Sequence, residues 1–326
     1  MISIGSTSPS SLANGGNQVA VTPPVMIVVL NWNRLADTVA CLESLSCLDY
    51  PARQIVVVDN GSDDGSVEAI RERFPAVALI ENEENLGYAA GNNKGVAYAL
   101  QAGVNFILIL NNDTLVDPEM LAHLIAVAEA NPQVGAVGPK IYYHAQPGRI
   151  WFAGGAINWQ GMFTANVGMD EEDRGQFEEV KPVDFLPGCA LLIKRAAWED
   201  IGPFDSRFFM YWEETDWCAR ARQAGYDLLF VPQARMWHKV SPVDQSESPR
   251  ILYYMTRNRF LFLHKNLPFP RKVIVLIRCS WGVFRTVIGF LRRGKREQAK
   301  AVVRGGADFL RGRFGHVPTA SEVCSK

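Results

Sequence analysis

The stretch FILILNNDTLVDPEM, residues 106–120, places an apolar run directly before a cluster of polar side chains. Residues 106–110 are apolar enough for a strand buried on both faces, as in parallel sheets. Polar residues 111–114 follow, and a helical pattern begins after Pro118. One interpretation is a strand-to-helix turn in which Asp113 or Thr114 caps the next helix. The other is a strand that delivers the Asp113 carboxylate to a ligand.

The same scheme recurs upstream at intervals of roughly 30 residues. Apolar runs in 25–34, 54–66 and 77–100 each end in polar residues and lead into a helical pattern. Strand, polar loop and helix in alternation predict a parallel sheet with crossover helices. Ligands bind at the carboxyl ends of the strands in such sheets. We therefore expect Asp59, Asn85 and Asp113 to converge on one edge.

The alternation fails after about residue 131. Residues 141–190 indicate shorter strands and loops, and the acidic segment MDEEDRGQFEEV (169–180) is typical of a mobile surface loop. Residues 187–202 predict a strand followed by a helix. Residues 208–226 place aromatic side chains before a carboxylate cluster that opens a helix, and 228–238 predict a final strand ending at His238.

The composition fits a cytosolic globular protein. The 326 residues are 48% hydrophobic, enough for one large core or two modest ones. The six cysteines lack metal-binding spacing and indicate reduced core thiols. Residues 1–22 are rich in Ser, Gly, Asn and Thr without an apolar signal segment, so they predict a disordered leader; 316–326 predict a flexible terminus.

Charge is distributed unevenly along the chain. Residues 1–270 hold 20 Lys and Arg against 31 Asp and Glu, whereas 271–313 hold 12 against 2. Arginines recur every seven residues at 271, 278, 285 and 292, among apolar side chains, too often for a comfortable transmembrane span. An amphipathic helix on an anionic membrane surface is one interpretation. Packing on the main domain or in a homo-oligomer is the other. Nucleic acid is disfavoured because the body is acidic.

The phosphates of a bound nucleotide would need an unusual counter-charge. NWNR stands where a dinucleotide-binding fold has its glycine-rich loop, and the chain has no Walker loop. A divalent cation on Asp113 would supply the charge. The acids of YWEETDW, residues 211–217, either stabilise a helix start or provide a general base. His238 is either a buried structural histidine or part of the site.

Eight motifs in order resemble one known family, the inverting glycosyltransferases of family 2 with a GT-A fold. The resemblance is to its bacterial rhamnosyl- and galactofuranosyltransferase-like branch, and it spans roughly residues 23–265. The motifs are VVLNWNR, IVVVDNGSDDGS, ENLGYAAGNNKG, LILNNDT, PGCALLIKR, FFMYWEETDWCARARQAGY, WH and YYMTRNR.

The resemblance implies an α/β GT-A fold with a mostly parallel, Rossmann-like sheet. It implies a nucleotide-sugar half (23–130), an acceptor and catalytic half (131–265) and a basic amphipathic helical tail (266–315). Glu214 would be the catalytic base with Asp216 just behind it, and Asp113 and His238 would hold Mg²⁺ or Mn²⁺. The set implied for the donor comprises Asn31, Asp59, Asn60, Gly61, Asn85, Gly87, Asn112 and Arg257, and Arg259 is a further candidate for diphosphate or an anionic acceptor.

Two positions depart from the family pattern. Asn111 replaces the first acid of the Asp-x-Asp metal motif, which leaves one carboxylate, and Glu214 replaces the usual aspartate and is one methylene longer. A structural alternative also stays open for Arg257 and Arg259, in which both lie on a solvated helix face and bind no ligand.

The implied activity is metal-assisted single displacement from a nucleotide sugar to a glycan or lipid-linked acceptor. dTDP-rhamnose is the first donor expected and UDP-linked sugars the second, and the site of action is the inner face of the cell membrane. The alternatives are a non-catalytic sugar-nucleotide-binding scaffold and a nucleotidyltransferase. The latter usually needs a glycine-rich basic loop where NWNR stands.

Overall fold

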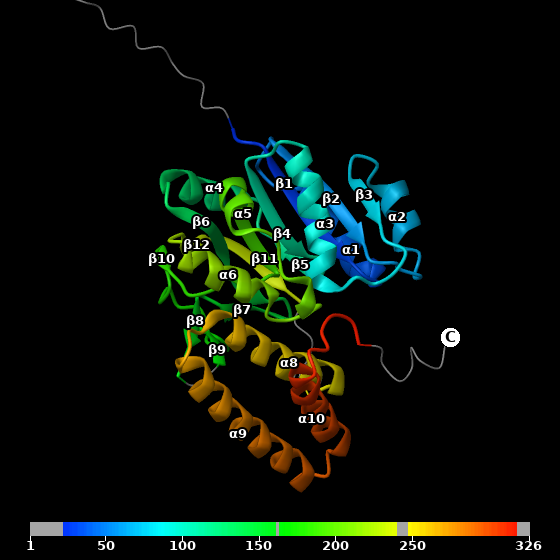
Figure 1. Ribbon diagram of the computed structural model, residues 1–326. Coiled ribbons are helices and arrows are strands. Elements are labelled where there is room, and N and C mark those ends of the chain that lie inside the picture. Colours follow the sequence, from blue (N-terminus) through cyan, green and yellow to red (C-terminus); the bar gives the residue numbers. More distant parts are fainter. Residues whose placement is uncertain (1–21, 161–162, 240–246, 318–326) are drawn as a thin grey trace, which may run out of the picture.

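A computed structural model describes residues 22–160, 163–239 and 247–317. The predicted leader (1–22) and the predicted terminus (316–326) therefore lie almost wholly outside the described residues. The described chain forms an α/β domain with three long helices beside it (Figure 1).

The predicted parallel sheet is present in the first half of the chain. Its strands are β1 (Val25–Asn31), β2 (Arg53–Asp59), β3 (Ala78–Glu81) and β4 (Phe106–Asn111). β1 pairs in parallel with both β2 and β4, and β2 with β3. The register places Asn31 beside Asp59 and Leu30 beside Asn111, so the polar strand ends meet at one edge. The connecting helices are α1 (Leu35–Ser46), α2 (Ser66–Arg73) and α3 (Gly87–Gln101).

The second half extends this sheet with mixed strand directions. The sheet order is β10-β12-β6-β11-β4-β1-β2-β3. β11 (Ala190–Lys194) runs antiparallel to β4 and β6, and β12 (Asp227–His238) runs parallel to β6 (Val134–Tyr143). The smaller elements are β5 (Thr114–Val116), β7 (Gln146–Phe152), β8 (Gly155–Asn158), β9 (Phe163–Asn166), β10 (Lys181–Pro182), α4 (Met120–Ala130), α5 (Arg195–Ile201), η1 (Ser206–Phe208) and α6 (Glu213–Gln223).

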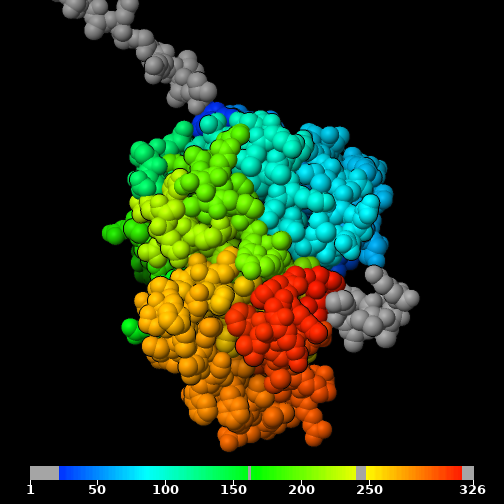
Figure 2. Space-filling view, in the orientation of Figure 1, coloured from blue at the N-terminus to red at the C-terminus, as the bar shows by residue number. Residues whose placement is uncertain are grey.

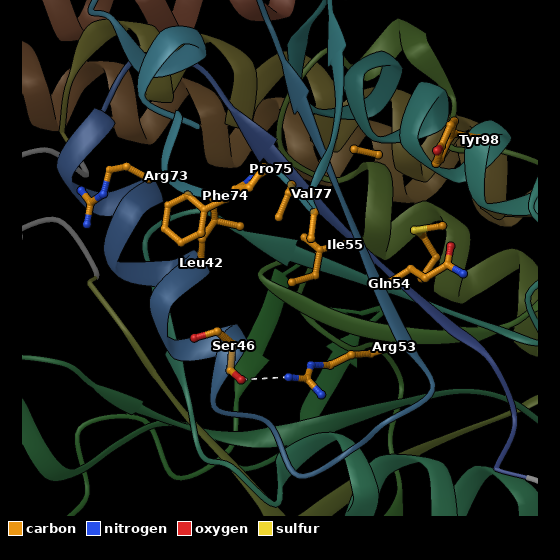
Figure 3. A pocket seen from close by; sticks show the side chains of 13 residues that line it. Leu42, Ser46, Arg53, Gln54, Ile55, Arg73, Phe74, Pro75, Val77 and Tyr98 are labelled. Carbon is orange, nitrogen blue, oxygen red and sulfur yellow. Dashed lines mark hydrogen bonds between the residues drawn. The ribbon is translucent and has the colours of Figure 1, made fainter. Parts of the chain in front are cut away.

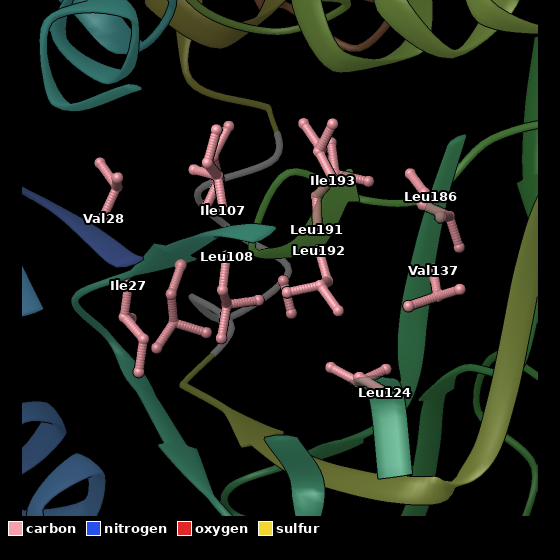
Figure 4. Packing of buried hydrophobic residues seen from close by; sticks show 14 of the residues in the cluster. Ile27, Val28, Ile107, Leu108, Leu124, Val137, Leu186, Leu191, Leu192 and Ile193 are labelled. Atoms are coloured by element: carbon pink, nitrogen blue, oxygen red, sulfur yellow. The ribbon is translucent and has the colours of Figure 1, made fainter. Parts of the chain in front are cut away.

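The main hydrophobic core lies on the central strands. Ile27 of β1, Leu108 of β4 and Leu192 of β11 are buried side by side across the sheet (Figure 4). These strands are apolar along their whole length because helices cover both faces of the sheet. Their rigidity fixes the polar residues that follow them.

The acidic segment 169–180 forms a mostly exposed surface loop, as expected, and also supplies partners to a buried lysine. The Lys140 ammonium group of β6 is fully buried, and its Nζ lies 3.0 Å from Asp173 Oδ2 and 2.5 Å from Glu178 Oε1. Tyr142 Oη also donates to Asp173 Oδ2. A buried ammonium needs anionic partners from elsewhere in the chain, so two acids of this surface loop have a structural role.

The predicted C-terminal helical tail is also present. It consists of α9 (Arg271–Arg292) and α10 (Arg296–Leu310), which pack on each other and on α8 (Pro249–Asn266), a helix of the preceding segment. Figure 2 shows them as an orange and red block against one end of the α/β domain. Val275 and Cys279 of α9 are buried toward the other helices, whereas Ile277 and Trp281 are 66% and 62% exposed. α9 therefore has an apolar inner side and an apolar outer side.

Candidate functional site

Asn31 and Asp59 form a buried hydrogen-bonded pair at the carboxyl edge of the sheet. Asn31 Nδ2 donates to Asp59 Oδ2 at 2.7 Å, and Ser62 donates to both Asp59 oxygens, from its backbone N–H and its hydroxyl. Asn31 and Asp59 are 0% and 1% exposed. The two residues expected at the nucleotide therefore lie together and position the loop after β2.

The amide of Asn112 joins the same network from β4. Asn112 Nδ2 donates to Asn31 Oδ1 at 3.1 Å and to Thr38 Oγ1 at 2.8 Å, and the Thr38 hydroxyl donates to Asn31 Oδ1 at 2.6 Å. The strand ends of β1, β2 and β4 are thus tied by side chains as well as by backbone register. This network directs the next residue, Asp113, away from the sheet.

A second amide network lies beside it. Asn60 Nδ2 donates to the Gly87 carbonyl at 3.1 Å and is 3.4 Å from Asn85 Oδ1, which accepts from the Gly87 N–H at 2.8 Å. Asn82 Nδ2 donates to Asn60 Oδ1 at 2.9 Å. These contacts hold the start of α3 against the end of β2. Asn60, Asn85 and Gly87, three members of the set implied for the donor, therefore lie together.

Two glycines are required by this geometry. Gly61 has φ +71° and Gly87 has φ +81°, values that side chains with a Cβ rarely adopt. At Gly87 an added Cβ would lie 2.4 Å from Cδ2 of Phe209. The glycine therefore permits close contact between α3 and the aromatic loop before α6.

Asp113 and His238 face each other across the junction of β5 and β12. His238 Nε2 lies 3.0 Å from Asp113 Oδ1. Burial opposes ionisation of Asp113, but the hydrogen bond and charge of His238 outweigh it and lower its pKa. Burial likewise opposes protonation of His238, but Cys189 and Asp113 outweigh it and raise its pKa to about 10. The two side chains are joined by one hydrogen bond, and both pKa shifts favour their charged forms.

The carboxylate of Asp113 and the imidazole of His238 suit a divalent cation whose other ligands come from a bound substrate or water. Neighbouring ligands around an octahedral ion with bonds of about 2.1 Å lie about 3 Å apart, and the observed 3.0 Å separation matches that spacing. No group of three or more His, Cys, Asp or Glu side chains suited to a metal occurs among the described residues. The protein offers two ligands, so the remaining positions would be filled by phosphate oxygens or water.

His238 and two glutamates line a common cavity of about 410 Å³. Glu213 and Glu214 enter it from the first turn of α6, and Asn111 enters it from the end of β4. Aromatic walls come from Tyr88, Trp151, Phe185, Tyr211 and Trp212. The cavity therefore combines two carboxyl groups with a candidate cation site and flat apolar surfaces, a composition suited to a sugar.

The two glutamates differ in their surroundings. Burial raises the pKa of both carboxyl groups. The Glu214 charge raises the pKa of Glu213 further, to well above its usual range. Backbone N–H groups at the helix start and a hydrogen bond from Glu213 partly oppose the rise for Glu214. These surroundings favour the proton on Glu213 over Glu214.

Asp216 lies outside this cavity. Its side chain is fully buried and accepts hydrogen bonds from Arg220 Nε at 3.0 Å, Lys265 Nζ at 2.8 Å and Asn266 Nδ2 at 2.9 Å. The residue sits behind Glu214, as expected, but its contacts join α6 to α8. We infer a positioning role.

Arg257 is likewise turned away from the cavity. Its guanidinium is fully buried and donates to the carbonyl groups of Gly315, Arg207 and Phe208. Asn258 Nδ2 donates to the carbonyls of Phe208, Met210 and Tyr211. The motif YYMTRNR thus holds the aromatic loop 208–212, and the structure does not bring Arg257 to the predicted donor site.

A different cavity, of about 630 Å³, lies at the opposite edge of the sheet (Figure 3). Arg53 and Gln54 line it from the amino end of β2, together with Leu42 of α1 and Phe74. The Arg53 guanidinium donates to the carbonyls of Leu45, Ser46 and Tyr50, so its charge supports the turn before β2. This cavity is remote from the polar strand ends.

Some residues of the candidate site do not stand out in the sequence. Glu213 was grouped with Glu214 and Asp216, but only the α6 geometry separates the two cavity-lining acids from the third. Tyr88 lies within the motif ENLGYAAGNNKG, where the amides and glycines attract attention instead. Trp151 lies inside β7, in a segment without a quoted motif.

Comparison with known proteins places these features in a family. The profile described as "Glycosyl transferase family 2" matches residues 26–202. An N-acetylglucosaminyl-diphospho-decaprenol L-rhamnosyltransferase of Mycobacterium tuberculosis is 31% identical over 214 residues, covering 60% of this chain and 70% of that protein. A dTDP-rhamnosyl transferase of Shigella flexneri is 25% identical over 281 residues, covering 80% and 87%.

Solved structures share the fold. A mannosyltransferase from Pyrobaculum calidifontis, in complex with GDP-Man and Mn²⁺, matches with a TM-score of 0.57 and 17% identity, covering 90% of this chain and 89% of that one. Staphylococcus aureus TarS matches with the same TM-score and identity, covering 88% and 49%. The expected GT-A fold is confirmed.

Proposed function

Because the chain belongs to glycosyl transferase family 2, we propose that this glycosyltransferase is an inverting enzyme. It moves a sugar from a nucleoside diphosphate to a hydroxyl group of a cell-surface glycan or a lipid-linked acceptor. The observation that carries the proposal is the single cavity that His238 shares with Glu213 and Glu214, with Asp113 bonded to His238. The side of the cavity at His238 suits a diphosphate, and the side at the two glutamates suits a nucleophilic hydroxyl.

Glu214 is the proposed general base. Its carboxylate takes the proton of the acceptor hydroxyl as that oxygen bonds to the anomeric carbon. The bond from the anomeric carbon to the phosphate oxygen breaks, and the nucleoside diphosphate leaves with the electron pair. One displacement inverts the configuration, so one catalytic base is sufficient, unlike the two carboxyl groups of a glycosidase.

Asp113 and His238 are the proposed protein ligands of a divalent cation, Mg²⁺ or Mn²⁺. When bound, this cation neutralises charge on the departing diphosphate. Manganese in the P. calidifontis mannosyltransferase complex supports the general expectation. A carboxylate and an imidazole suit Mn²⁺ at least as well as the harder Mg²⁺.

We propose rhamnose from dTDP-rhamnose as the first donor to test, and UDP-linked sugars as the second. The names of the M. tuberculosis and S. flexneri relatives support this order. Asn31, Asp59, Asn60 and Asn85 would form the floor and wall of the nucleotide site, with Gly61 and Gly87 allowing the turns beside it.

The proposed place of action is the cytoplasmic face of the membrane. By length and composition alone, α9 is the one helix among the described residues that is long and apolar enough to cross a membrane. Its exposed side carries Ile274, Ile277, Trp281 and Phe284, and Arg278, Arg285 and Arg292 are also exposed along the helix. We propose that α9 lies on an anionic surface, because apolar and basic groups together match a lipid headgroup region.

A panel of nucleotide sugars tests the function. Thermal shift with Mn²⁺ or Mg²⁺ identifies a stabilising donor, and release of nucleoside diphosphate then measures turnover with added acceptors. We expect stabilisation by a sugar nucleotide that depends on the cation, followed by transfer with inversion, read from the anomeric configuration by NMR. Retained configuration would exclude the single-displacement mechanism.

A further inference from the structure

A second pocket, of about 250 Å³, adjoins the catalytic cavity. It lies between β9 and the three C-terminal helices, and Thr164, Trp212 and Met255 line both spaces. Arg259 of α8 contributes the one charged side chain among the described residues that line this pocket. Met255 and Arg259 are four residues apart on α8, so Arg259 lies about 6 Å further along the helix.

Two hydrogen-bond donors in this lining have no acceptor. Arg259 Nε and Trp212 Nε1 are both buried and lack a partner in the described part of the chain. Across the same residues, no ion pair within 4.0 Å involves Arg259. In the described chain, the one side-chain partner of the guanidinium is the buried Cys279 thiol of α9, a weak acceptor; burial raises the pKa of that thiol, and the charge and hydrogen bond of Arg259 oppose the rise.

Such donors are costly unless a ligand satisfies them. A buried donor without a partner costs about 1–3 kcal/mol, and more when it is charged. Arg257, the fully buried arginine of the same motif, has carbonyl acceptors for its guanidinium, whereas Arg259 is half-buried. The contrast indicates that Arg259 is held for an acceptor from outside the chain. A guanidinium fork beside an indole N–H suits phosphate oxygens.

We propose that the Arg259 pocket binds the phosphate group of a lipid-diphosphate-linked acceptor. This inference rests on the proposed function, because it assumes that the adjoining cavity holds the reacting sugar. The acceptor sugar would lie in the cavity with its hydroxyl at Glu214. Its diphosphate would pass Trp212 and Met255 to reach Arg259.

The position of α9 supports the binding of a lipid-linked acceptor beside this pocket. Val283 and Thr286 of α9 line the pocket. The opposite side of the same helix exposes Ile277 and Trp281. One helix thus contributes both to the anion pocket and to the proposed membrane surface. A lipid-linked diphosphate has its charge and its apolar chain joined in the same way.

The test uses the full-length protein and calorimetric titration with farnesyl diphosphate, farnesol and inorganic pyrophosphate. R259Q is expected to weaken farnesyl diphosphate binding by about tenfold or more, the usual effect of losing a charged hydrogen bond. Farnesol binding is expected to stay unchanged, and R259K is expected to recover part of the loss. R296Q removes an exposed charge from α10 and serves as the matched control.

Three results would overturn the assignment. They are equal farnesyl diphosphate binding by R259Q and R296Q, equal losses for farnesol and farnesyl diphosphate in R259Q, and pyrophosphate binding as tight as that of farnesyl diphosphate. The last result would indicate a site for free anions. If R259Q does not fold, W212F, which removes the N–H and keeps a ring, must weaken farnesyl diphosphate selectively; no change overturns the proposal.

Activity measurements separate this inference from the proposed function. R259Q is expected to lose far more of its transfer to a diphosphate-linked acceptor than of its donor hydrolysis, and R296Q is expected to lose neither. If no sugar nucleotide is turned over although farnesyl diphosphate binding depends on Arg259, the proposed function fails and the anion pocket stands. If transfer is intact in R259Q, the pocket assignment alone fails.

Discussion

Adjacent glutamates in one cavity acquire different chemistry from their surroundings. Glu213 is 3% exposed, and the charge of its neighbour favours its protonated form. Glu214 receives support for its negative charge from the backbone at the start of α6. A helix start stabilises a carboxylate, so the geometry divides the pair into a proton-holding acid and a base.

Replacing Glu214 with Gln is expected to lower kcat by about 10²–10⁴-fold, the usual value of general-base catalysis. Donor affinity is expected to stay nearly unchanged, because the amide keeps the shape of the carboxylate. Single-turnover rates and donor titration measure the two quantities. D216N serves as the comparison and is expected to act mainly on stability through Lys265 and Asn266; a larger kcat defect in D216N would assign the base to Asp216.

The raised pKa of the pair predicts how stability depends on pH. The folded state binds these protons more tightly than the unfolded state, because the pKa of each glutamate is raised in the fold. Their stabilising contribution is therefore complete below the unfolded pKa of about 4.3 and is lost as pH rises through the higher folded values. E213Q is expected to raise the free energy of unfolding at pH 8 relative to wild type, with a smaller gain at pH 5. Urea unfolding at both pH values measures this, and an equal effect at the two would contradict the assignment.

Asp113 is expected to be required for metal-dependent turnover. D113A removes the only carboxylate of the pair, so kcat/KM is expected to fall by at least about 10²-fold, comparable with other losses of electrostatic stabilisation. H238A is expected to lose less, because phosphates hold the cation too. Activity against Mn²⁺ concentration measures both variants, and full activity in excess chelator would exclude the metal role.

The meeting of the strand-end residues was predictable, because the carboxyl ends of parallel strands lie at the same edge of a sheet. A run of buried residues fixes which side chains follow at the edge, and Asn31, Asp59 and Asn112 meet there. The surroundings of Arg257 and Arg259 were not predictable in this way. The two residues are separated by one position on α8, and only packing against loop 208–212 and α9 determines which one is satisfied.

At the scale of the element, the aromatic loop before α6 is held in a strained conformation. Phe209, Tyr211 and Trp212 have φ values of 65°, 67° and 77°, in the left-handed region. Each such residue costs of order 1–3 kcal/mol. Asn258 and Arg257 of α8 offset this cost with hydrogen bonds to the loop carbonyls. The strain directs the first turn of α6 into the cavity.

Asn258→Ala is therefore expected to reduce both stability and catalysis. The carbonyls of Met210 and Tyr211 lose their side-chain donor, while Phe208 keeps Arg257, so the free energy of unfolding is expected to fall by about 2–4 kcal/mol. The kcat is expected to fall as well, because Glu214 follows the loop directly. Urea unfolding and turnover are measured beside N131A, an exposed asparagine at the end of α4. Unchanged kcat in a folded N258A would show that the loop needs no such support.

Element prediction succeeded where one local signal dominated. The apolar runs of β1, β2 and β4 and the helical pattern of α9 needed no tertiary information. The ion pairs of the acidic segment 169–180 were not predicted, because their partner, Lys140, belongs to a strand about 30 residues away. Composition alone does not reveal a buried counter-charge.

The whole molecule combines an acidic α/β domain with a basic helical block. The charge asymmetry of the sequence coincides with this structural division, since 271–313 contains α9 and α10. The outer side of α9 includes a hollow of about 470 Å³ bordered by Trp281, Phe284, Arg285 and Arg292. Apolar and basic groups therefore share one surface.

Changing Arg278, Arg285 and Arg292 together to Glu is expected to weaken binding to anionic vesicles much more than to neutral ones. Each basic residue near an anionic surface contributes about 1 kcal/mol, so the loss is expected to exceed about 100-fold and to shrink in high salt. Vesicle co-sedimentation measures it, with R71E, R73E and R174E combined as a control on the α/β domain. Indifference to lipid charge, together with a changed mass in light scattering, would instead assign α9 to a homo-oligomer.

The contact between α3 and Phe209 has a consequence for how the two halves work together. The backbone N–H groups of Tyr88 and Ala89 both donate to the Phe209 carbonyl, at 2.6 and 3.2 Å. Free amides at a helix start commonly receive a phosphate, but here the chain fills the position itself. A diphosphate could bind these two N–H groups only by displacing the loop that leads to Glu214. Donor anchoring through α3 and correct placement of the base are thus mutually exclusive, which leaves the Asp113 side to balance the charge of the leaving group.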